Sequence, residues 1–96
     1  MQAVKNYIEI NKQRFLDELI EVLRIPSVSA NPAHKADMLR TAQFVAEAFL
    51  KAGVDHSEVI PTAGHPVVYA EKMIDPKYPT ILVYGHYDVQ PPDPLD

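Results

Sequence analysis

His86 and Asp88 are the residues of this sequence whose types and spacing best fit metal chemistry. Side chains alternate along an extended chain, so residues two positions apart project to the same side. A neutral imidazole is a common zinc ligand, and an acceptor on its second ring nitrogen fixes its tautomer and ring angle. The spacing therefore predicts a metal site in which His86 binds a cation and Asp88 orients the imidazole.

A continuous apolar run precedes this pair and ends at Gly85. Residues 80–84 read Thr-Ile-Leu-Val-Tyr, the β-branched and aromatic composition of a strand buried on both faces. In open α/β sheets, ligands collect at the carboxyl ends of the strands. The order of the sequence therefore predicts that the His-Tyr-Asp triplet lies where a buried strand emerges from a sheet.

Two amphipathic helices are predicted upstream. Apolar residues recur at helical spacing over residues 3–24, and Pro26 stops this helix. A second helix begins at Asn31 and Pro32, which suit the cap and the first helical position, and it ends at Gly53. The predicted packed faces consist of Ile8, Phe15, Leu16, Leu19, Ile20 and Leu23 in the first helix, and of Met38, Leu39, Ala42, Val45, Ala46, Phe49 and Leu50 in the second.

Short strands are predicted beyond the second helix. Residues 57–61 and 67–73 have strand composition, and residues 62–65 form a hairpin-type turn between them. Residues 75–79 form a second connection, which leads to the strand at 80–84. Two helices followed by three strands indicate the α/β class.

The composition restricts the class of protein further. The 96 residues are 47% apolar and 23% charged, which suits one small globular domain. The net charge of −4 gives no basic footprint for nucleic acid or an anionic membrane surface. The chain has no cysteine, so a metal would be held by His, Asp and Glu alone. No secretory signal or membrane span is visible, and we expect a cytoplasmic location.

Residues 85–91, which read Gly-His-Tyr-Asp-Val-Gln-Pro, resemble the first zinc-binding motif of the co-catalytic zinc aminoacylase and carnosinase-like dipeptidase family. Residues 15–19 and 23–29 resemble that family's first helix and following loop, and residues 64–70 resemble its second strand. The resemblance implies the N-terminal portion of a three-layer α/β/α metallopeptidase catalytic domain with a central mixed sheet. Residues 1–96 are then a partial catalytic domain.

The resemblance also implies an activity, the hydrolysis of amide bonds in dipeptides or N-acyl amino acids. In the family's scheme two zinc ions are bound, His86 is a ligand of one of them, and Asp88 is the active-site residue that holds the imidazole. Manganese or cobalt could replace zinc, because His and carboxylate ligands accept several metals. The family's further ligands lie downstream of Asp96, so we expect a fragment that is inactive alone and binds zinc weakly.

Two other functions stay open. The first is a non-catalytic half-domain that acts by association with another chain. The exposed edge of a strand at 80–84 would favour such pairing, and self-association or a homo-oligomer is expected even for the enzyme fragment. The second is an unrelated metal hydrolase such as a phosphoesterase, although those enzymes commonly carry the reverse order, Asp-x-His, after a strand.

The remaining polar candidates are expected to have structural roles. His65 is assigned to a turn or to packing, and His34 and His56 to the solvated surface. Ser27 and Ser29 lack the strand-turn-helix context of a nucleophile elbow, so they are predicted to be loop serines. The acidic residues of the first helix are predicted to form a solvated face: Asp17, Glu18 and Glu21.

Overall fold

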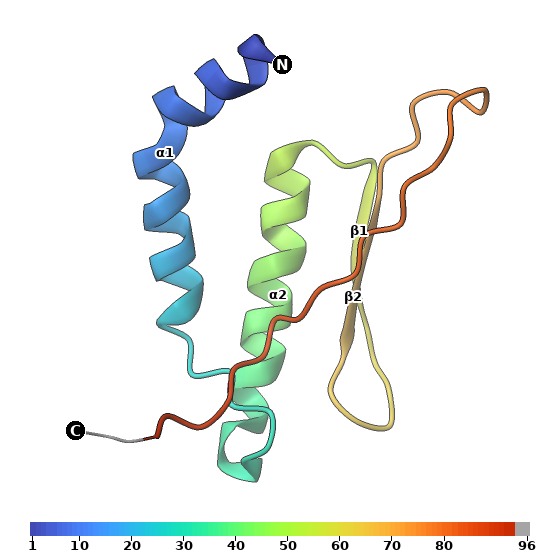
Figure 1. The fold of residues 1–96 in the computed structure, drawn as a ribbon. Helices are drawn as coiled ribbons and strands as arrows, with labels where there is room; N and C mark the ends of the chain where they lie inside the picture. Colours follow the sequence, from blue (N-terminus) through green and yellow to red (C-terminus); the bar gives the residue numbers. More distant parts are fainter. Residues whose placement is uncertain (94–96) are drawn as a thin grey trace.

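The computed structural model describes residues 1–93, which fold as two helices followed by a β-hairpin and a long irregular segment (Figure 1). The last three residues of the expected partial domain, 94–96, lie outside the described residues. The elements in chain order are α1 (Gln2–Leu23), the 3-10 helix η1 (Pro32–His34), α2 (Lys35–Ala52), β1 (His56–Ile60) and β2 (Val67–Glu71). Within this part of the chain, neither α-helix combines the length and apolarity needed to cross a bilayer.

The predicted helices are confirmed, with α1 shifted by one residue. The side chain of Asn31 accepts a hydrogen bond from the backbone amide of Ala33 at 3.0 Å, and Pro32 opens η1. Gly53 ends α2 with a φ of 99°, in the left-handed region that glycine enters without steric cost. Local capping chemistry therefore sets both ends of the segment that carries α2.

The predicted hairpin is also confirmed. β1 and β2 pair antiparallel, and the hydroxyl of Thr62 closes the turn between them. This hydroxyl accepts a hydrogen bond from the Gly64 amide at 3.0 Å and donates one to the carbonyl of His65 at 2.7 Å. The hairpin packs on α2, and the Ser57 hydroxyl donates to the Ala46 carbonyl at 2.8 Å.

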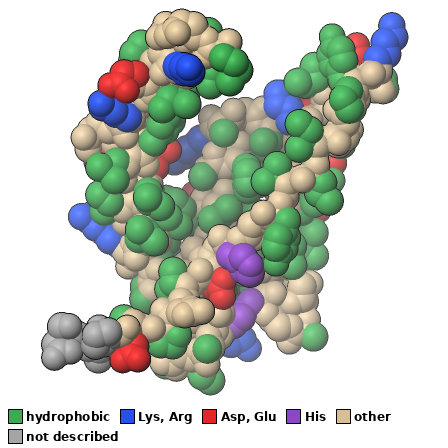
Figure 2. Space-filling view, viewed as in Figure 1, with side chains coloured by type: hydrophobic (Ala, Val, Ile, Leu, Met, Phe, Trp, Pro, Cys, Tyr) green, Lys and Arg blue, Asp and Glu red, His purple; other side chains and the backbone are tan. Residues whose placement is uncertain are grey.

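The buried side chains come from α2 and from the loop that precedes it. They are Ser27, Val28, Met38, Thr41, Ala42 and Ala46. The predicted packing of α1 is wrong, because no residue of this helix is buried; Leu19 is 52% exposed and Leu23 is 58% exposed. Among the described helices and strands, α1 contacts α2 alone, so its remaining apolar surface has no cover. Figure 2 shows apolar side chains spread over this helix.

The strand predicted at residues 80–84 does not form. Ile81, Leu82, Val83 and Tyr84 are between 82% and 91% exposed, and residues 80–84 have no strand partner in the described part of the chain. A β-strand needs the N–H and C=O groups of a neighbour, and composition alone does not supply one. The sheet described here is therefore a two-stranded antiparallel one instead of the predicted three strands of a mixed sheet.

Candidate metal site

The segment after the hairpin crosses α2 and reaches the loop between the two helices (Figure 1). The amide of Val89 donates a hydrogen bond to the Ser27 carbonyl at 2.9 Å, and the hydroxyl of Ser27 donates to the Tyr87 carbonyl at 3.0 Å. Val28 and Val89 form a parallel β-bridge at the same place. Ser27 and Val28 are only 2% and 7% exposed and thus belong to the core, so these contacts attach the segment to the core.

His86 and Asp88 lie beside each other on the attached segment, as the alternation of an extended chain predicts. Nδ1 of His86 is 3.3 Å from Oδ1 of Asp88, slightly longer than the usual N–H···O hydrogen bond. The His86 side chain is 71% exposed and that of Asp88 34%. The ring of Tyr84 meets the imidazole edge-on, with centroids 5.4 Å apart. Because Nδ1 faces the carboxylate, Nε2 is the nitrogen left for a cation.

The second carboxylate oxygen of Asp88 is held by Ser29. The Ser29 hydroxyl donates to Oδ2 of Asp88 at 2.6 Å, and the Ser29 carbonyl lies 2.9 Å from Nε2 of His65. Since a carbonyl only accepts, Nε2 of His65 carries the proton in this contact. Figure 2 shows two histidine side chains next to an acidic one on this face. His65, Ser29, Asp88 and His86 thus form one continuous set of contacts from the hairpin turn to the C-terminal segment.

The contacts of Ser29 and His65 are not predicted by the sequence. Ser29 was predicted to be a loop serine, and His65 to serve a turn or packing. A weak signal was present, because Ser27 and Ser29 are two positions apart and project to the same side of an extended loop. Both hydroxyls contact the segment that carries His86, one at Tyr87 and one at Asp88.

The hydrogen bond from Ser29 lowers the pKa of Asp88 below its usual range, and the nearby imidazole of His86 acts in the same direction. Asp88 is therefore ionised at neutral pH and offers a full negative charge to the ring beside it. Burial raises the pKa of Tyr87, and the charge of Asp88 adds to this shift. The Tyr87 phenol keeps its proton and donates it to the carbonyl of Pro66 at 2.5 Å.

Known dipeptidases resemble this chain over nearly all of its length. The Cys-Gly metallodipeptidase DUG1 of Saccharomyces cerevisiae is 27% identical over 103 residues, and the Beta-Ala-His dipeptidase of Rattus norvegicus is 30% identical over 105 residues. Each alignment covers 95% of this chain and 21% of the relative. A solved structure of the dipeptidase Dug1p from Saccharomyces cerevisiae matches 95% of the chain and 21% of its own length, with a TM-score of 0.87 and 28% identity.

The chain is homologous to the N-terminal part of these dipeptidases. It spans about a fifth of the length of the curated relatives that it matches. No protein-family model matches it. The resemblance drawn from residues 85–91 is confirmed, and so is the α/β fold, since two helices followed by two antiparallel strands match Dug1p. The roles of His86 and Asp88 stay predictions.

The described residues of this chain offer one exposed imidazole beside a carboxylate but no complete cation site. Within residues 1–93 no three His, Asp or Glu side chains are grouped so that they could hold a metal ion. A catalytic zinc usually has about three protein ligands. His86 fits one ligand position, because its ring is exposed and one nitrogen points away from Asp88.

The other two histidines lie elsewhere, each beside a carboxylate. His56 is exposed, as predicted, and its Nε2 is 3.2 Å from Glu58. His34 is 31% exposed, which is less than expected for a solvated position, and its Nδ1 is 2.8 Å from Asp37. Their carboxylate partners, Asp37 and Glu58, belong to α2 and β1 and not to the segment that carries His86.

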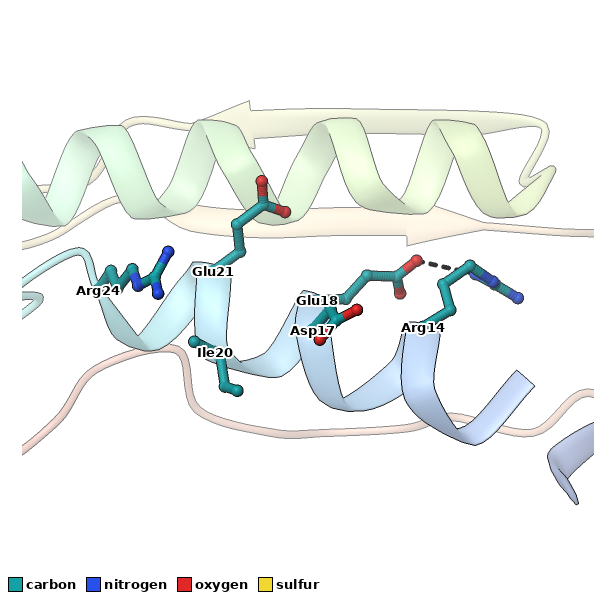
Figure 3. A pocket seen from close by; sticks show the side chains of 6 residues that line it. All are labelled: Arg14, Asp17, Glu18, Ile20, Glu21 and Arg24. Atoms are coloured by element: carbon teal, nitrogen blue, oxygen red, sulfur yellow. Dashed lines mark hydrogen bonds and ion pairs between the residues drawn. The ribbon is translucent and has the colours of Figure 1, made fainter. Parts of the chain in front are cut away.

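A groove of about 520 Å³ on α1 includes neither His86 nor Asp88. Figure 3 shows its side chains fanning out from the helix instead of converging on one point. Arg14 and Glu18 form an ion pair of 2.8 Å, and both side chains are at least half exposed. Exposed pairs of this kind contribute little to stability. The lining residues are Arg14, Asp17, Glu18, Ile20, Glu21 and Arg24.

Proposed function

We propose that this chain forms the N-terminal part of the catalytic domain of a zinc-dependent dipeptidase or related amidohydrolase, in which His86 binds one zinc ion and Asp88 orients its imidazole. The observation that carries the proposal is the 3.3 Å contact between Nδ1 of His86 and Oδ1 of Asp88, in a chain similar to dipeptidases over 95% of its length. Small peptides with a free or modified amino end, such as dipeptides and N-acyl amino acids, are the proposed substrate class.

The contribution of these residues is to present a ligand in one orientation. Asp88 is ionised, so it favours a proton on Nδ1 of His86 and leaves the lone pair of Nε2 available. The ring of Tyr84 packs against the imidazole and limits its rotation. A bound zinc ion would polarise the scissile carbonyl and lower the pKa of a water molecule. Tyr87 and Val89 hold the segment on either side of Asp88.

One imidazole cannot hold two metal ions, and we propose that residues 1–96 alone bind zinc weakly and do not hydrolyse dipeptides. Hydrolysis of a Cys-Gly or β-Ala-His dipeptide by the purified 96-residue chain, at a rate above that of His86→Ala, would contradict this. Tight stoichiometric zinc binding in a calorimetric titration would contradict it as well.

Zinc titration of the isotopically labelled chain tests the ligand directly. We expect zinc to shift the ring signals of His86 before those of the other histidines. His56 is the matched control, because it lies beside a carboxylate two positions away, with an exposure of 51%. His86→Ala should remove the first binding event, and His56→Ala should preserve it. Equal shifts at His56 and His86 would refute the assignment.

A second proposed function is association with another copy of the chain. Ile81, Leu82, Val83 and Tyr84 are consecutive, apolar and more than 80% exposed. Residues 80–84 carry no charge, so two copies of the segment can pair as strands without repulsion between like charges. A cytoplasmic location would suit both functions. The oligomeric state of the chain tests this second proposal. A charged residue placed within residues 80–84 tests whether the copies pair through this segment.

A further inference from the structure

We propose that Ser29 is a positioning residue of the metal site: its hydroxyl holds the carboxylate of Asp88, and through Asp88 it selects the tautomer of His86. The inference rests on the proposed function, since it deepens the role given to His86. It adds a residue from the loop between α1 and α2 to a site otherwise built from the C-terminal segment.

The two oxygens of the Asp88 carboxylate have different partners. Oδ2 accepts the Ser29 hydroxyl at 2.6 Å, within the short range of an O–H···O⁻ hydrogen bond to a charged acceptor. Oδ1 faces Nδ1 of His86 at the longer distance of 3.3 Å. The Ser29 bond is therefore the stronger constraint on the rotation of the carboxylate. With Oδ2 fixed, Oδ1 is held toward the imidazole.

Ser29 is itself fixed by its surroundings. Its carbonyl accepts a hydrogen bond from Nε2 of His65 at 2.9 Å, which ties the loop to the hairpin turn. On its other side, Ser27 and Val28 are buried and contact the segment that carries Asp88. The hydroxyl is thus presented from an anchored loop, and it does not behave as a freely rotating surface group.

The position of the carboxylate has a chemical consequence for His86. An acceptor at Nδ1 favours the tautomer with a proton on Nδ1, and the metal ligand must be the other nitrogen, unprotonated. If the Ser29 hydroxyl is lost, the partly exposed Asp88 side chain can turn toward water. His86 then populates both tautomers, and a smaller fraction of molecules offers Nε2 to a cation.

The ¹⁵N shifts of the His86 ring in the 96-residue chain test this inference without any metal. The spectra are recorded at a pH at which the shifts themselves show a neutral ring, because only a neutral ring reports its tautomer. In the wild-type chain we expect a protonated Nδ1 and an unprotonated Nε2. In Ser29→Ala the two signals should move toward each other, and Ser29→Thr, which keeps the hydroxyl, should restore them.

Two further variants separate this role from a general effect on folding. Ser57→Ala is the matched control, since it removes a serine hydroxyl that donates to a backbone carbonyl far from the site, and the His86 shifts should not change. Ser29→Cys keeps the shape of the side chain with a somewhat larger atom, and it weakens the donor. If Ser29→Ala does not fold, Ser29→Cys should still move the two signals toward each other.

Unchanged His86 shifts in both Ser29→Ala and Ser29→Cys overturn the inference, and so does a failure of Ser29→Thr to restore them. The proposed function fails separately, if zinc does not shift the His86 ring in the wild-type chain. The tautomer and the zinc response are measured on the same signals, so the two failures are distinguishable.

Discussion

Replacing Ser27 by alanine removes the hydroxyl that holds the segment with His86 and Asp88 against the loop between the helices. Ser27 is 2% exposed, and its hydroxyl donates to the carbonyl of Tyr87 at 3.0 Å. The substitution leaves the backbone hydrogen bond from the Val89 amide to the Ser27 carbonyl in place. We therefore expect the segment to stay attached but to open more often.

The size of the effect follows from the one contact that is lost. A typical intramolecular hydrogen bond contributes about 0.5–1.5 kcal/mol to stability. At 25 °C this free energy raises the opening equilibrium by a factor of about 2 to 13, if the loss acts on local opening alone. The Val89 amide reports this opening, because its hydrogen bond to Ser27 must break before the amide exchanges.

Hydrogen exchange of the wild-type chain and the Ser27→Ala variant measures the effect. The Val89 amide should exchange about 2- to 13-fold faster in the variant, while the amides of α2 keep their wild-type rates. Ser57→Ala, which loses a hydroxyl contact to the Ala46 carbonyl, should leave Val89 unchanged. The reasoning is refuted if Val89 exchange does not change, or if Ser27→Ala accelerates the amides of α2 to the same extent.

Four other changes have defined outcomes. Met38 is 2% exposed, so Met38→Ala should lower the free energy of unfolding, measured in urea, by about 2–5 kcal/mol. A loss below about 1 kcal/mol would show that the side chain does not pack as described. Gly53→Ala should lower the free energy of unfolding by about 1–2 kcal/mol, because the φ of 99° is unfavourable for alanine even though its Cβ would meet nothing within 4 Å. An unchanged melting temperature would argue against the left-handed cap. The pKa of Asp88 is lowered in the folded chain, so ionised Asp88 stabilises the fold fully above the unfolded-state pKa of about 3.9. This stabilisation is lost as the pH falls through the lower folded-state pKa. Ser29→Ala removes the main cause of the shift, so the acid-induced loss of stability should be smaller in this variant. Leu82→Lys should reduce self-association in sedimentation equilibrium, and a wild-type chain that remains monomeric at high concentration would contradict the proposed pairing.

The features that the sequence predicted correctly depend on neighbours within a few residues. Asn31 and Pro32 start the second helical segment, Gly53 ends it, and Thr62 closes the hairpin turn through contacts two or three residues away. The proximity of His86 and Asp88 follows from the same kind of rule, the alternation of side chains along an extended chain. Such rules act before any tertiary packing forms.

The predictions that failed depend on partners far away in the chain or absent from the described residues. The predicted packed face of α1 has the correct composition, but among the described helices and strands only α2 contacts this helix, and none of its residues is buried. The segment at residues 80–84 also has the composition of a strand, but no described strand pairs with it. The contact of Ser29 with Asp88 spans 59 positions, and that of His65 with Ser29 spans 36. Periodicity and motif spacing carry no information over such separations.

The hydrogen bond between Ser27 and Tyr87 joins residues 60 positions apart, which has a consequence for synthesis on the ribosome. At about 5–20 residues per second, translation makes Ser27 roughly 3–12 s before Tyr87. During that interval α2 and the hairpin have time to form, whereas the serine loop remains hydrated. His86 therefore reaches a platform that was built earlier, and the residues beside it, Tyr87 and Val89, dock on the serine loop only after that interval.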